Sequence, residues 1–92
     1  MFSISNPAVQ LYKEELDLQA GDGLQLFVRY AGTGIGFCLG VEKGLPQDGD
    51  YVQEIEGIRF FVKPHEVWFV DQMKMDCDDS GENFSIDLPS IA

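Results

Sequence analysis

Hydrophobic and polar residues alternate on both sides of a glycine-rich segment in the first half of the chain. The apolar positions before and after these glycines are Leu24, Leu26, Val28 and Tyr30, then Ile35, Phe37, Leu39 and Val41. Alternation with a period of two on either side of a turn is typical of two strands joined by that turn. The pattern predicts a β-hairpin over 24–41, and any chemistry is expected at its glycine-rich turn.

The residues before this hairpin favour a short strand followed by a helix. Phe2 and Ile4 alternate with serines. Asn6 and Pro7 predict a helix start, because Asn can cap free N–H groups and Pro is tolerated at the first helical position. Apolar residues then recur at helical spacing as far as about Gln19, namely Val9, Tyr12 and Leu16, with Ala8 and Leu11 beside them. A Gly-Asp-Gly sequence ends the helix, which we expect to cover a sheet.

The residues after the hairpin predict two further strands and a helical turn. A polar loop over Glu42–Asp50 leads into strands at Tyr51–Glu56 and Ile58–Val62, which are joined by a tight turn and ended by Pro64. Residues 65–72 favour a helical turn over a continued strand. We expect this turn to carry three side chains into the core: Val67, Trp68 and Val70.

The end of the chain predicts a closing hairpin. Its first strand alternates at Met73, Met75 and Cys77, and its second at Phe84, Ile86 and Leu88. Six or seven short strands and one capped helix are typical of an α+β, mainly β fold, and we expect a single domain over residues 1–92.

The charge balance limits the classes of partner. The 92 residues include sixteen acidic and six scattered basic side chains, which gives a formal net charge of −10. Phosphate backbones and anionic membranes attract clusters of Lys and Arg, so neither nucleic acid nor a membrane is an expected partner. A solvated acidic surface, a cation or a basic protein partner fits better. The N-terminus has no signal-peptide pattern and no run is long enough to span a membrane, so a cytoplasmic location is expected.

Residue patterns of enzymes are missing from the sequence. His65 is the only histidine, and beside Pro64 at a strand end it is expected at the surface or in a turn. The glycines of residues 32–36 open a strand, whereas a phosphate loop opens a helix and carries a Lys. We therefore expect no catalytic activity.

An acidic segment near the C-terminus has the spacing of a calcium-binding loop. Asp76, Asp78, Ser80, Gly81 and Asp87 match positions 1, 3, 5, 6 and 12 of an EF-hand. That loop ends on a bidentate Glu and lies between two helices, whereas here the flanking residues alternate as strands do. An acidic hairpin turn is the better interpretation.

The two cysteines are widely separated and are expected as reduced thiols. Cys77 shares a face with two methionines and is expected in the core. Cys38 shares a strand face with Gly36 and Gly40, where missing side chains let a ligand or another backbone approach. A thiol packed as a small hydrophobe is the default interpretation of Cys38, and a ligand-binding or redox role is the alternative.

The order of these elements resembles the HesB-like, A-type iron–sulfur cluster carrier domain, in its short form. The resemblance covers nearly the whole chain, and its most specific parts are RYAGTGIGF at 29–37 and EGIRFFV at 56–62. It implies a compact mixed β-sandwich or pseudo-barrel with one N-terminal helix. In the family, three cysteines bind the cluster, one in the glycine-rich turn and two near the C-terminus. The resemblance places the turn ligand at Thr33, and the C-terminal pair has no counterpart here.

Three hypotheses follow from this resemblance. The first is a non-enzymatic accessory or adaptor protein of iron–sulfur assembly that binds protein partners and has lost the cluster ligands. The second is a transient carrier of iron or an iron–sulfur cluster, bound by Cys38 of two subunits in a homodimer. The third is a small-ligand site at the glycine-rich turn, contacted by Thr33, Arg29 and Tyr30.

Overall fold

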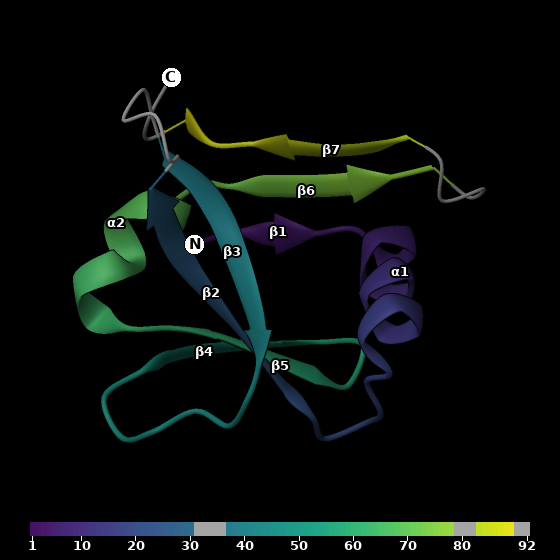
Figure 1. The fold of residues 1–92 in the computed structure, drawn as a ribbon, viewed down its shortest axis with the longest axis horizontal. Helices are drawn as coiled ribbons and strands as arrows, with labels where there is room; N and C mark the ends of the chain where they lie inside the picture. The colour runs from purple at the N-terminus through teal and green to yellow at the C-terminus, as the bar shows by residue number, and fades with distance from the viewer. Residues whose placement is uncertain (31–36, 79–82, 90–92) are drawn as a thin grey trace.

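The computed structural model describes residues 1–30, 37–78 and 83–89, which form two β-sheets, two α-helices and a 3₁₀ turn (Figure 1). The helices are α1 at Asn6–Leu16 and α2 at Val67–Val70, with the 3₁₀ turn η1 at Pro64–Glu66. The strands are β1 at Ser3–Ile4, β2 at Gly23–Tyr30, β3 at Phe37–Lys43, β4 at Tyr51–Ile55, β5 at Ile58–Val62, β6 at Lys74–Cys77 and β7 at Phe84–Asp87. This is the expected α+β, mainly β fold, without a closed barrel.

The predicted central hairpin is confirmed. β2 and β3 pair antiparallel in unbroken register, from Leu24 opposite Lys43 to Tyr30 opposite Phe37. Residues 31–36, which connect the two strands, lie outside the described residues. Leu24 and Leu26 face the core and are fully buried, as the alternation predicts.

The hairpin belongs to a four-stranded sheet of order β3-β2-β5-β4. β5 runs parallel to β2 and antiparallel to β4. The predicted tight turn joins β4 to β5 at Glu56 and Gly57, whose φ angles are 53° and 82°. Two consecutive positive φ angles are typical of the turn that matches the twist of a two-residue hairpin.

The second sheet has the order β1-β6-β7. β1 pairs parallel with β6, and β6 pairs antiparallel with β7 as the closing hairpin predicts. Three alternating side chains of this segment are buried, as expected: Met73, Met75 and Cys77. The two sheets and α1 share one hydrophobic core.

Both ends of α1 differ from the prediction. Ser5 rather than Asn6 is the cap: its backbone is extended, and its Oγ accepts a hydrogen bond from the Ala8 N–H at 3.4 Å. Asn6 is already helical, which places Pro7 in the first turn where its missing N–H costs nothing. The helix ends at Leu16 rather than near Gln19, because Asp17 adopts a left-handed conformation with φ 52°.

The helical turn after Pro64 is confirmed, but the expected position of Trp68 is wrong. Its side chain is 49% exposed, whereas Phe69 and Val70 are fully buried. Successive helical residues point about 100° apart, so four consecutive residues cannot all face one core. Phe69 occupies the core position expected for Trp68.

Within the described ranges, neither helix is long and apolar enough to cross a membrane.

Candidate functional site

The outer part of the β2–β3 hairpin brings together two of the predicted site residues. Arg29 and Cys38 are directly paired across the two strands, and both are exposed. Side chains of directly paired residues lie on the same face of a sheet. Tyr30 follows at the last pair of the hairpin, opposite Phe37. Thr33, the position of the family's turn ligand, lies outside the described residues.

At Gly40, the face that carries Cys38 is less open than predicted, and Gly36 lies outside the described residues. A Cβ atom built on Gly40 would overlap the ring of Phe27 and lie 2.7 Å from Cδ of Arg29. The side chains of β2 therefore fill the space above Gly40. A ligand of Cys38 would approach from the exposed side of the thiol and not across this glycine.

Cys77 is a core residue, as predicted. It is only 5% exposed and belongs to the shared hydrophobic cluster. Burial raises the pKa of its thiol, and the carboxylates of Asp78 and Asp76 raise it further. A neutral thiol is a poor ligand for iron, because the thiolate is the form that binds metals.

The calcium-loop interpretation finds no support in the geometry. Asp76 and Asp87 belong to β6 and β7, where an EF-hand requires helices. The Asp78 carboxylate accepts a hydrogen bond of 2.6 Å from Nδ2 of Asn83. Ser80 and Gly81 lie outside the described residues, and the described part of the chain contains no cluster of three potential metal ligands from His, Cys, Asp and Glu.

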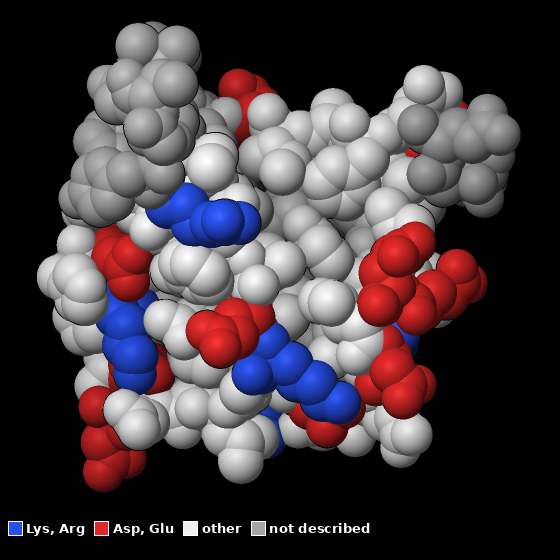
Figure 2. Space-filling view, in the orientation of Figure 1, with Lys and Arg blue, Asp and Glu red and all other residues white. Residues whose placement is uncertain are grey.

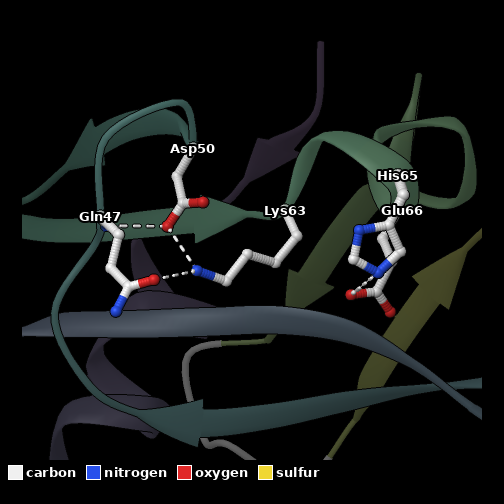
Figure 3. Close-up of polar contacts among 5 residues, drawn as sticks. All are labelled: Gln47, Asp50, Lys63, His65 and Glu66. Carbon is white, nitrogen blue, oxygen red and sulfur yellow. Dashed lines mark hydrogen bonds and ion pairs between the residues drawn. The ribbon is translucent and has the colours of Figure 1, made fainter.

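A half-buried ion pair fixes the loop between β3 and β4, and sequence reasoning missed it. Lys63 Nζ lies 3.1 Å from Oδ2 of Asp50 and 3.1 Å from Oε1 of Gln47, as Figure 3 shows. The Gln47 N–H donates to the same Asp50 oxygen at 2.8 Å. This N–H, together with the Lys63 ammonium, lowers the pKa of the Asp50 carboxyl against the opposing effect of burial. The group is structural and presents no reactive atom.

Glu66 is a second polar residue that the sequence did not single out. Its Oε2 accepts a 2.8 Å hydrogen bond from the N–H of Val28, beyond the part of β2 that pairs with β5. The Nε2 atom of His65 lies 3.5 Å from Oε1 of Glu66 (Figure 3). The His65 side chain is 79% exposed, so the surface position predicted for it is confirmed.

A groove lies between α1, β3 and β7. We call it the α1–β3–β7 groove. It has a volume of about 230 Å³ and is lined by Leu11, Tyr12, Glu15, Leu16, Val41 and Phe84. In Figure 2, the surface between these elements is uncharged, and acidic side chains gather over α1 at its right edge. Tyr12 and Leu16, which recur at helical spacing in the sequence, are both half-buried.

Comparison with protein families identifies the chain over nearly its whole length. Residues 1–91 match the family described as iron-sulphur cluster biosynthesis. A protein of Bacillus subtilis strain 168 named pyruvate dehydrogenase inhibitor is 43% identical over 72 residues, which cover 75% of this chain and 76% of that protein. An uncharacterized protein of Staphylococcus saprophyticus is 31% identical over 81 residues, covering 82% and 83% of the two chains.

Solved structures show the same fold at low sequence identity. Escherichia coli SufA, involved in biosynthesis of iron-sulfur clusters, superimposes with a TM-score of 0.70 at 21% identity, covering 99% of this chain and 82% of SufA. IscA with a [2Fe-2S] cluster gives 0.73 at 18% identity, with 97% and 86% covered. The match over residues 1–91 and the shared fold show that this chain belongs to the iron-sulphur cluster biosynthesis family, as a HesB-like, A-type carrier domain.

Proposed function

We propose that this chain is a non-enzymatic regulator that acts by binding another protein in the cytoplasm. Its proposed partner is an enzyme complex of the pyruvate dehydrogenase type. The partner class is supported by the 43% identity to the Bacillus subtilis protein named pyruvate dehydrogenase inhibitor. A protein that inhibits a complex by binding needs an exposed surface and no reactive centre of its own.

The position of the two thiols is the observation that carries this proposal. Clusters typically take four ligands, and the chain has two cysteines. Cys77 is buried with a raised pKa, which leaves Cys38 as the one exposed thiol. A single exposed cysteine per chain is a poor basis for cluster binding. The family fold then serves as a scaffold for a protein-binding surface.

Cosedimentation with a purified pyruvate dehydrogenase complex tests the proposal. The complex sediments rapidly, whereas this chain of 10.3 kDa stays in solution alone. We expect a saturable fraction of the chain to sediment with the complex. The Cys38→Ala variant is expected to bind equally, because the thiol has no role in this account. Wild-type chain that stays in the supernatant at every concentration of complex would refute the proposal.

A second candidate function is an accessory or carrier role in iron–sulfur cluster assembly. The family match over residues 1–91 favours it, and so does the exposure of Cys38, which two subunits of a homodimer would have to contribute. Anaerobic reconstitution with iron and sulfide separates the two candidates. An absorption band from thiolate-bound iron that disappears in Cys38→Ala would establish the carrier role. An iron-free, colourless product would eliminate the carrier role. The accessory role would then be tested by binding assays with assembly proteins.

A further inference from the structure

We propose that the α1–β3–β7 groove binds a basic segment of a partner protein, which inserts one apolar side chain between α1, β3 and β7. The inference rests on the proposed protein-binding function and names the surface that performs it. The groove is lined by Leu11, Tyr12, Glu15, Leu16, Val41 and Phe84.

The size of the groove fits a side chain better than a free small molecule. Its volume is about 230 Å³. Sites for small molecules typically hold about 300–1,000 Å³ and enclose most of the ligand. The apolar walls provide no convergent set of polar groups that would orient such a ligand. An apolar anchor residue of a partner, surrounded by further contacts on the rim, matches both the volume and the lining.

The floor of the groove is fixed by contacts that exist before any partner arrives. The ring of Tyr12 packs edge-on against Phe84, with the centroids 5.7 Å apart. The Tyr12 hydroxyl donates to Sδ of Met75 at 3.4 Å, so its polar atom is turned away from solvent. Burial raises the pKa of this hydroxyl, which keeps it neutral. A preformed groove binds with a smaller entropic cost than one that must be ordered.

The charge on one side of the groove defines the chemistry of the partner. Glu14 and Glu15 lie in the last turn of α1, and Asp17 caps it; all three are exposed. Carboxylates at a helix C-terminus are unfavourable, because that end of the helix carries partial negative charge. No ion pair in the described part of the chain neutralises these carboxylates. These carboxylates therefore do not stabilise α1. Lys or Arg residues beside the apolar anchor of a partner would complement their negative charge.

A second copy of this chain is a poor occupant of the groove. Each copy carries a formal net charge of −10, so two copies repel each other at an acidic rim. Like charges at an interface oppose association and favour a partner of opposite charge. The occupant is therefore assigned to a different, basic protein.

An NMR titration of the ¹⁵N-labelled chain with a designed peptide tests this assignment. The peptide has one central Leu flanked on each side by two Lys, within Gly and Ser residues. The matched peptide replaces the Leu by Ser and keeps the charge. Two protein variants complete the test: Glu14→Gln with Glu15→Gln, and, as a control with the same charge change, Asp48→Asn with Asp71→Asn. The control residues are exposed and do not line the groove.

We expect saturable shifts of the amide signals of Leu11, Leu16, Val41 and Phe84 with the Leu peptide. The Ser peptide and the Glu14/Glu15 variant are each expected to bind about tenfold more weakly, and the Asp48/Asp71 control to bind as wild type. Absence of saturable shifts, shifts centred elsewhere, or equal binding of both peptides would overturn the assignment. Groove shifts that depend on the protein concentration without peptide would overturn it in favour of a second copy. Cosedimentation with pyruvate dehydrogenase is a separate readout, so failure of one proposal is distinguishable from failure of the other.

Discussion

The ring of Tyr12 meets the ring of Phe84 edge-on, with the two planes at 81°. This contact joins α1 to β7, which lies beside β6 at the edge of its sheet among the described strands. Edge-to-face geometry is favourable because the positive edge of one ring faces the negative face of the other. The pair thus holds the last strand against the helix and closes the floor of the α1–β3–β7 groove.

Removing the Phe84 ring is expected to destabilise the chain more than removing the Tyr12 hydroxyl. Phe84→Ala should lower the free energy of unfolding by about 1–3 kcal/mol, which is less than for a fully buried Phe because Phe84 is half-buried. Tyr12→Phe keeps both rings and loses only the contact with Met75, so its effect should stay below about 1 kcal/mol. Urea unfolding of both variants measures the difference. Equal effects of the two substitutions would show that the ring contact contributes nothing.

Two glycines at the end of the hairpin where β2 begins and β3 ends should respond differently to alanine. A Cβ on Gly23 would overlap the carbonyl oxygen of Gly44, whose N–H also donates to the Gly23 carbonyl at 3.1 Å. Because backbone cannot move aside as a side chain does, Gly23→Ala should cost about 1–3 kcal/mol or more. A Cβ on Gly44 would lie 3.8 Å from Cζ of Phe61, an ordinary contact. In thermal unfolding, the melting temperature of Gly44→Ala should stay close to that of wild type, and that of Gly23→Ala should be clearly lower. A lower melting temperature for Gly44→Ala than for Gly23→Ala would contradict the close approach of Gly23 to Gly44.

The Lys63–Asp50 ion pair predicts a defined loss of stability at low pH. The folded chain lowers the pKa of Asp50, first through the Gln47 N–H and then through Lys63. A lowered carboxyl pKa stabilises the fold fully above the ordinary value of about 3.9, and this contribution disappears as pH falls toward the lowered value. Melting temperatures of wild type and Asp50→Asn, measured from pH 7 to pH 2, should therefore differ at neutral pH and converge below about pH 4. A constant difference across this range would rule out the ion pair as its source.

Much of the fold could be predicted from the sequence because its signals are local. The alternation of apolar and polar residues predicted which side chains of the central hairpin face the core. The sequence Glu56-Gly57 predicted the separate tight turn between β4 and β5. The position of Trp68 could not be predicted, because the competition between it and Phe69 is decided by packing against distant strands. The sequence also could not decide between Ser5 and Asn6 as the helix cap. Both side chains can cap a helix, and the two choices differ only by one residue in where the helix begins.

The candidate site was harder to predict than the fold. Cys38 was identified from the strand pattern and Arg29 as a contact of the hypothetical small-ligand site, and their pairing follows from the hairpin register. Residues that act across long sequence separations left no local signal. Glu66 reaches Val28 across 38 positions, and the α1–β3–β7 groove combines Leu11, Val41 and Phe84 from three separate elements. Apolar residues at helical spacing in α1 indicate that one face of the helix packs against other elements. They do not indicate which strands pack there.

Glu66 provides a further test of these long-range contacts. Its side chain is 16% exposed, and Glu66→Ala would leave the Val28 N–H without its acceptor. We expect a loss of about 1–3 kcal/mol in unfolding free energy and faster hydrogen exchange at the Val28 amide. Glu66→Gln retains an acceptor oxygen and should lose less. Unchanged exchange at Val28 in the alanine variant would contradict the hydrogen bond.

The rate of NADH formation by a purified pyruvate dehydrogenase complex tests the central claim most directly. The assay compares iron-free wild-type chain, the Cys38→Ala variant and no added chain, at saturating pyruvate, coenzyme A and NAD. A regulator that acts through its surface should lower the rate in a saturable manner, with equal potency for wild type and Cys38→Ala. A rate that is unchanged at any concentration of the chain, or inhibition that requires iron and Cys38, would contradict the account.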